Sequence, residues 1–235
     1  MSLALAVPPA PDDTAALAFQ AGMERMAAVN AGLKGCTFTF RSQEYVDGAT
    51  TDWSTADVKF RVEEDIYMSF TAGPNEGRKV LYRGPDWNGG KFRVDPGRWM
   101  PVLSLHPDSR LARRGGRHSI RELPLTRLGA KILTDAIAVR DHPTWKPDID
   151  DLGTQSIGGS PARCYDSRLP KSEDASLYAH RVEICLDDAT GLPARLKIWD
   201  HEDGSVRLVE SYEYRDLKVN PGLTDADFDP DTYGL

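Results

Sequence analysis

The side chains that most often carry out catalysis or bind metals are scattered along this sequence. No histidine has a second histidine or a cysteine three or four residues away, which is the spacing that a helix-borne metal site needs. The five histidines are His106, His118, His142, His180 and His201. A Gly-x-Ser-x-Gly motif and a glycine-rich phosphate loop that opens a helix are also missing. We therefore expect no metal and no cofactor.

Acidic residues are plentiful, but they stand where such residues are usually solvated. Glu63-Glu64-Asp65 and Asp150-Asp151 fall in predicted turns, where a surface role is commoner than an acid–base pair. A hydrolase acting on a lipid-like substrate would need a nucleophile, a base and an orienting group in one place, and no spacing indicates them. The sequence predicts that the protein is not an enzyme.

The three cysteines allow one cross-link. Cys164 and Cys185 lie in two adjacent predicted strands, where a cross-strand disulfide is geometrically possible, whereas Cys36 stands alone. Two reduced thiols are the alternative. No Cys-x-x-Cys spacing indicates a metal or redox site.

An arginine-rich segment is the electrostatic exception on this chain. Its arginines surround Gly115-Gly116 and are Arg110, Arg113, Arg114, Arg117 and Arg121. They could attract an anionic partner, such as a lipid head group or an acidic protein face. The alternative is a solvated loop whose arginines pair with local carboxylates.

The first element expected along the chain is a helix. Apolar residues at helical spacing predict it from Asp12 or Asp13 to Gly32. From Cys36 onward the apolar period becomes two, which is typical of half-buried strands. The strands predicted in this half are 36–40, 58–62, 66–70, 79–83 and 91–94.

The second half interrupts and then resumes the strand pattern. The segment 101–121 has no regular period, 125–139 is a second amphipathic helix, and 141–159 is a predicted connector rich in Pro, Asp and Gly. Strands are then predicted at 162–167, 181–186, 195–199 and 207–214. Because strands and helices do not alternate, the fold class is α+β with an antiparallel sheet.

One face of this sheet is rich in apolar residues. They are Phe38, Phe40, Val58, Phe60, Val62, Met68 and Phe70 in the early strands, with Leu196 and Ile198 in a later one. We expect a strongly curved sheet, an incomplete β-barrel, with the helices over its concave face. These residues then either line a cavity that binds an apolar ligand or pack as core.

The composition limits which classes of protein and partner fit this chain. With 29 Lys and Arg against 36 Asp and Glu, the formal net charge is −7, which argues against nucleic acid as a partner. No run approaches the roughly 20 apolar residues that span a bilayer. We expect one domain over 12–235, preceded at 1–11 by a tether or the stump of a signal peptide. A disordered tail of a cytosolic protein is the alternative.

Several strings resemble the LolA-like superfamily of periplasmic lipoprotein carriers, and more closely an uncharacterised branch of it. They are Gly35-Cys36-Thr37-Phe38-Thr39-Phe40-Arg41 after the first helix, 58–62 and 66–70 in the next strands, the hairpin 187–195, and the closing strand and exit 212–228. The resemblance implies an incomplete antiparallel barrel, closed by helices, that encloses a hydrophobic cavity for acyl chains. Such carriers have an Arg-Pro pair before the third strand, where the arginine tethers the helical lid. Here Glu63-Glu64-Asp65 stands in that place.

These observations lead to one functional hypothesis and an alternative to it. The first is a non-enzymatic, periplasmic or otherwise exported, monomeric protein that binds a lipid or an acylated ligand in a hydrophobic cavity and touches a membrane or an envelope protein peripherally. The alternative is a structural or interaction domain of the cell envelope that has a filled core and docks an acidic partner through the arginine-rich segment.

Overall fold

The structure is a computed structural model that describes residues 11–62, 64–97, 99–122, 125–146, 148–171 and 174–235. For residues 11–13 and 126 only the backbone is described. The predicted N-terminal segment 1–11 therefore falls outside the described residues, except for Pro11, which begins the first helix.

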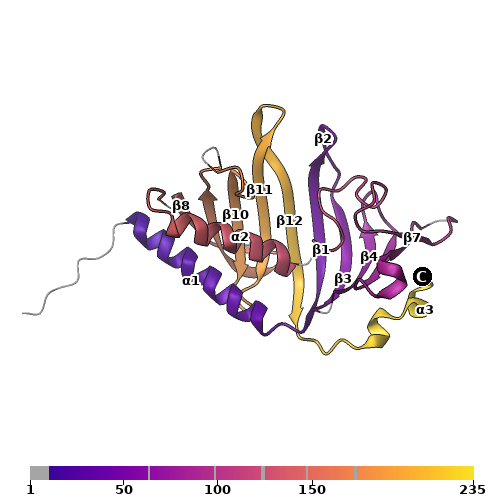
Figure 1. Ribbon diagram of the computed structural model, residues 1–235. Coiled ribbons are helices and arrows are strands. Elements are labelled where there is room, and N and C mark those ends of the chain that lie inside the picture. The colour runs from indigo at the N-terminus through magenta and orange to yellow at the C-terminus, as the bar shows by residue number, and fades with distance from the viewer. Residues whose placement is uncertain (1–10, 63, 98, 123–124, 147, 172–173) are drawn as a thin grey trace, which may run out of the picture.

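All strands of the described residues belong to one antiparallel sheet of twelve strands (Figure 1). The first seven are β1 (Gly35–Val46), β2 (Ala49–Thr50), β3 (Ser54–Arg61), β4 (Asp65–Ala72), β5 (Lys79–Arg83), β6 (Phe92–Asp95) and β7 (Leu103–Leu105). The others are β8 (Asp148–Ile157), β9 (Ser160–Arg168), β10 (Arg181–Asp187), β11 (Pro193–Glu202) and β12 (Ser205–Val219). The helices are α1 (Pro11–Ala31), η1 (Trp87–Gly90), α2 (Leu125–Asp141), η2 (Asp225–Phe228) and α3 (Pro230–Tyr233).

The strand order shows how the two halves of the chain meet. It runs β7-β6-β5-β4-β3-β1-β12-β11-β10-β9-β8, and β2 adds to β1. The first strand thus pairs with the last, and Phe40 lies opposite Tyr214. Because β7 and β8 lie at the two ends of this order, the sheet is open and does not close into a barrel. The predicted α+β class with a curved antiparallel sheet is confirmed.

The two long helices cover only one half of the concave face. Figure 1 shows α1 and α2 lying across strands β8 to β12, and both helices contribute buried residues to the main core, among them Met23, Met26, Leu125 and Ile132. Over the other half, the irregular segment that follows β7 takes the place of a helix. Its Ile120 is buried in the same core. No helix of the described residues is long and apolar enough to cross a membrane.

The C-terminal tail covers the opposite face of the sheet. Alternation along β4 and β5 turns Tyr67 and Leu81 away from the main core, and the tail residues Phe228 and Leu235 bury them in a separate cluster. The Tyr67 and Tyr233 rings stack with centroids 3.6 Å apart. The tail thereby fixes β3 to β5 from behind.

The predicted connector 141–159 is wrong, because most of it forms strand β8. This strand ends the sheet and is polar, with Asp148, Asp150 and Asp151 near its start, so its composition is that of a loop. Edge strands commonly carry charged residues that discourage pairing with another strand. In β8 these charges obscure the apolar alternation by which a strand is predicted from sequence. The segment 101–121 likewise contains the short strand β7.

The disulfide that the sequence left open is present between Cys164 and Cys185, which lie directly opposite each other on β9 and β10. The bond spans 21 positions of sequence. Replacing both cysteines with alanine removes this constraint from the unfolded chain.

We predict that Cys164→Ala/Cys185→Ala lowers the free energy of unfolding by about 3 kcal/mol, the value expected for a loop of this length. Urea denaturation measures the difference. Adding dithiothreitol should lower the unfolding free energy of the wild type to that of the variant and leave the value for the variant unchanged. Equal midpoints for the two oxidised proteins would contradict the prediction.

Candidate functional site

Most of the apolar face that the sequence singled out is packed core. The Phe40 ring lies 5.3 Å from the Tyr214 ring and 5.4 Å from the Tyr212 ring, and the Phe38 ring lies 5.5 Å from Tyr214, between centroids. The residues of the predicted set that are buried in the main core are Phe38, Phe40, Val58, Phe60, Met68, Leu196 and Ile198. Aromatic side chains from β12 thus occupy the concave face beside β1.

The other two residues of that set lie at the margin. Phe70 is partly buried against the core. Val62 follows the last residue of β3, and its side chain is 49% exposed. The alternation of apolar and polar residues continues in the sequence beyond Arg61, where strand β3 ends. The pattern therefore assigned Val62 to the concave face, although Val62 no longer belongs to the strand.

A large groove lies instead on the half of the sheet that the helices cover. It has a volume of about 1010 Å³ and runs between α1, α2 and the strands β8 and β9. Its apolar lining residues are Ala16, Leu17, Phe19, Met23, Leu133, Ala136, Ile137, Val139, Ile149 and Leu169. Leu17 and Ile137 are 57% and 41% exposed although they line an apolar surface. A concave surface of this size and composition is typical of ligand sites.

Charged residues also line the groove, and they are Glu24, Arg140, Lys146, Asp148 and Asp150. Arg140 on α2 is hydrogen-bonded to Asp141, with 2.7 Å between Nε and Oδ1. On the strand side, Arg168 is 2.9 Å from a carboxylate oxygen of both Asp148 and Asp150. A mainly apolar lining that also carries charges of both signs suits an amphiphile whose chain lies inside and whose head group stays near water.

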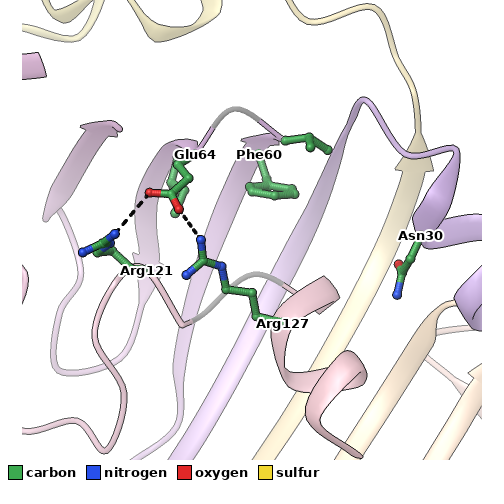
Figure 2. Close-up of a pocket in the computed structure, with 7 residues that line it drawn as sticks. Asn30, Phe60, Glu64, Arg121 and Arg127 are labelled. Atoms are coloured by element: carbon green, nitrogen blue, oxygen red, sulfur yellow. Dashed lines mark hydrogen bonds and ion pairs between the residues drawn. The ribbon is translucent and has the colours of Figure 1, made fainter. Parts of the chain in front are cut away.

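The arginine-rich segment does not present one basic surface. Arg117 is directed at Glu202 and Glu210, at 2.7 and 3.3 Å, and Arg113 pairs with Asp108 at 3.3 Å. Figure 2 shows Arg121 beside Glu64, 3.7 Å away. Arg110 and Arg114 are exposed. Pairing with carboxylates, which was the alternative interpretation, describes three of the five arginines.

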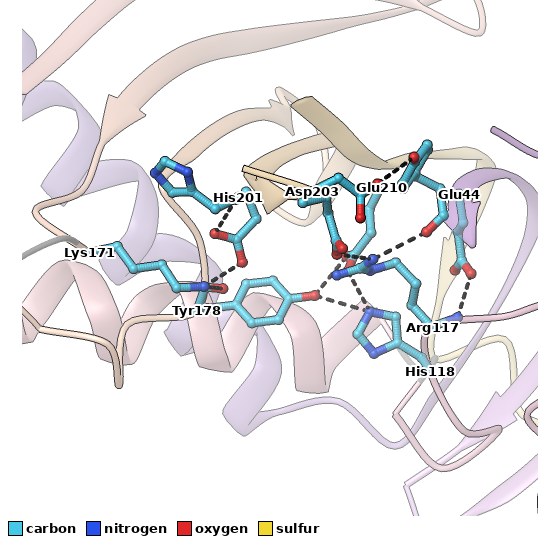
Figure 3. Close-up of polar contacts among 11 residues, drawn as sticks. Glu44, Arg117, His118, Lys171, Tyr178, His201, Asp203 and Glu210 are labelled. Carbon is cyan, nitrogen blue, oxygen red and sulfur yellow. Dashed lines mark hydrogen bonds and ion pairs between the residues drawn. The ribbon is translucent and has the colours of Figure 1, made fainter. Parts of the chain in front are cut away.

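A buried polar cluster that the sequence analysis missed surrounds Arg117 (Figure 3). Glu44 and Glu210 lie opposite each other in the pairing of β1 with β12, and both carboxylates are buried. The Arg117 backbone N–H donates to Glu44 at 2.7 Å. The Tyr178 hydroxyl donates to Glu210 at 2.7 Å, and His118 Nε2 lies 3.1 Å from Glu210.

The pKa values in this cluster follow from burial and from the two carboxylates. Burial lowers the pKa of His118, but the hydrogen bond to Glu210 and the charges of Glu210, Glu44 and Glu122 outweigh it, so the pKa is raised. Burial first, and then the Glu210 charge, raise the pKa of Tyr178 well above its usual value. The phenol therefore stays protonated as a donor, and the cluster fixes the segment after β7 to the sheet.

One feature of the sequence could have indicated this cluster. Glu210 shares a strand face with Tyr212 and Tyr214, so it is a charged residue at a core-facing position of a strand. Such a residue requires a partner. The partners Arg117, His118 and Tyr178 lie far away in the sequence, so no local spacing connects them.

The remaining cysteine, Cys36, lies in the core. Cys36 is free and buried, and burial raises the pKa of its thiol to about 12. A thiol of this kind is a small core residue.

Comparison with known proteins identifies the family. The family DUF1571, described as proteins of unknown function, matches residues 33–233. The chain belongs to this family. No protein of curated function matches this DUF1571 chain.

Several solved structures are similar to this chain. The Mycobacterium tuberculosis lipoprotein LppX is 17% identical, covers 88% of this chain and 98% of its own, and has a TM-score of 0.52. A LolA-superfamily protein from Nitrosomonas europaea is 14% identical over 91% of this chain and 98% of its own, with a TM-score of 0.37. The MucA/MucB complex structure of Pseudomonas aeruginosa is 16% identical, covers 89% of this chain and 60% of its own, and has a TM-score of 0.46. The match to a family of unknown function agrees with the uncharacterised branch that the sequence analysis named, and the likeness to LppX supports the fold alone.

The raised pKa of His118 predicts how stability depends on pH. Because the folded-state pKa lies above the unfolded value of about 6.5, protonated His118 stabilises the fold fully below that pH, and this contribution disappears as the pH rises through the folded pKa.

We therefore expect the difference in unfolding free energy between wild type and His118→Gln to be larger at pH 5.5 than at pH 8.5, as measured by urea denaturation. His106→Gln, which changes an exposed histidine, is the matched control. A difference that is constant with pH would disprove a protonated His118 in the folded state.

Proposed function

We propose that this DUF1571 protein is a non-enzymatic protein of the cell envelope that binds a lipid or an acylated ligand, and that the acyl chain lies in the groove between α1, α2 and β8. The observation that carries this proposal is the groove itself, a hollow of about 1010 Å³ with a mainly apolar lining that the described residues leave open.

The driving force would be burial of the acyl chain. Each methylene removed from water contributes about 0.8 kcal/mol, so a chain of a dozen gains on the order of 10 kcal/mol before the cost of ordering it. Exposed Leu17 and Ile137 lose contact with water at the same time. Binding of this kind needs no catalytic group.

Two observations support an exported location. The Cys164–Cys185 disulfide is typical of oxidising compartments such as the periplasm. The similar fold of LppX, a lipoprotein, agrees with an envelope setting. We propose that the protein acts there as a single domain over 12–235.

A charge placed in the groove tests the proposal. Leu17→Asp and Ile137→Asp put a carboxylate on exposed positions of the lining, so we expect both to fold and to weaken binding of a fluorescent fatty acid by at least about tenfold, because the acyl chain would have to desolvate the charge.

Val206→Asp is the matched control, since Val206 is 43% exposed and lies on β12 outside the groove. It should bind the probe like the wild type. No saturable binding to the wild type, together with no lipid in an organic extract of the purified protein, would reject the proposal and favour the interaction domain with a filled core.

A further inference from the structure

A second, smaller cavity lies at the other end of the helix pair (Figure 2). Asn30 at the end of α1 and Arg127 at the start of α2 line it on one side, and Phe60, Val62 and Ile66 at the adjoining ends of β3 and β4 line it on the other. Glu64 and Arg121 complete the lining. Its volume is about 130 Å³. An engineered apolar cavity of about 150 Å³ holds benzene, so a group of several heavy atoms fits here.

Among the described residues that line this cavity, the charges do not balance. Arg121 and Arg127 share the single carboxylate of Glu64, so the lining residues carry one positive charge in excess. Arg127 is hydrogen-bonded to Glu64 Oε1, whereas Arg121 is 3.7 Å from Oε2, beyond hydrogen-bond distance. The cavity therefore favours an anion over a cation.

Several polar atoms here have no hydrogen-bond partner among the described residues. Asn30 Oδ1, Glu64 Oε2 and Arg121 Nε are all buried without one. Buried polar groups are normally satisfied. Arg121 Nε–H is a donor, so an anion can satisfy it, whereas Asn30 Oδ1 and Glu64 Oε2 are acceptors, and Glu64 Oε2 faces Arg121 at 3.7 Å. Because the O and N of the Asn30 amide can be exchanged, Asn30 can also present an N–H donor to the cavity from its other side.

The rest of the lining is apolar. Phe60 and Ile66 are buried, and half-exposed Val62 stands where the chain leaves β3. An anionic oxygen group at the arginines would place any attached carbon chain against these three side chains. The guanidinium fork matches carboxylate and phosphate oxygens.

We propose that this cavity is an anion-binding site that takes the carboxylate or phosphate group of a small amphiphile, with Arg121 and Arg127 donating to the anion and the Glu64 carboxylate competing with it for the two guanidinium groups. The site is separate from the groove and does not depend on the proposed acyl-chain binding.

Titration of the full chain at low salt, followed by NMR at the Asn30 side-chain amide and Arg121 Nε–H, tests the proposal. The probes are sodium hexanoate, inorganic phosphate and uncharged hexan-1-ol. We expect saturable shifts with hexanoate. If phosphate also binds, the anionic group alone is sufficient for recognition. If hexanoate binds and phosphate does not, the carbon chain contributes to recognition as well. Equal shifts with hexanol, or no shift with either anion, would overturn the proposal.

Two variants change the charge in opposite directions. Arg121→Gln should weaken hexanoate binding at least about tenfold, because a charge-assisted donor is lost. Glu64→Gln removes the competing carboxylate and should tighten binding severalfold, an effect that loss of structure does not produce. Arg113→Gln, an arginine of the same segment paired with Asp108, is the control and should bind like the wild type. Weaker binding by Glu64→Gln in a folded protein would contradict the assignment.

Discussion

Two buried glutamates face each other across the strands that join the halves of this sheet. Glu44 on β1 and Glu210 on β12 are register partners, an arrangement that is unfavourable unless cations and donors surround it. Arg117, His118 and Tyr178 provide them. The segment after β7 is thereby bound to the middle of the concave face, and the rest of the architecture follows from where that segment lies.

The concave face is covered differently in its two halves, so one half is packed core and the other contains the groove. Beside β1, the anchored segment and the aromatic residues of β12 fill the curved face, so Phe38 and Phe40 pack against Tyr212 and Tyr214. Beyond β12, two helices must cover the strands out to the edge strand β8. They meet the sheet closely through Met23 and Ile132 but leave Leu17 and Ile137 exposed above a groove. The groove can lie at the edge strand β8 because the sheet is open and β8 does not pair with β7.

Much of the fold could be predicted from local patterns. The helices at 11–31 and 125–141 and the strands around Phe38, Phe60 and Met68 all follow from spacing. Strand β8 could not be predicted, because its Asp148, Asp150 and Asp151 serve an exposed edge and look like a loop. The site was harder to predict. Inward-facing Phe40 and Leu196 have the same alternation whether they line a cavity or pack as core, and only the side chains across from them decide which.

The proposed binding mode places an acyl chain between the helices and the edge of the sheet, and not against β1 and β3. Photocrosslinking with a diazirine-bearing fatty acid, mapped by mass spectrometry, tests it most directly. If the acyl chain lies in the groove, adducts form on the peptides that contain residues 16–24 and 133–140, and they are lost when excess unlabelled fatty acid is added. Adducts confined to 36–40 and 58–60, or adducts that excess fatty acid does not displace, would contradict it.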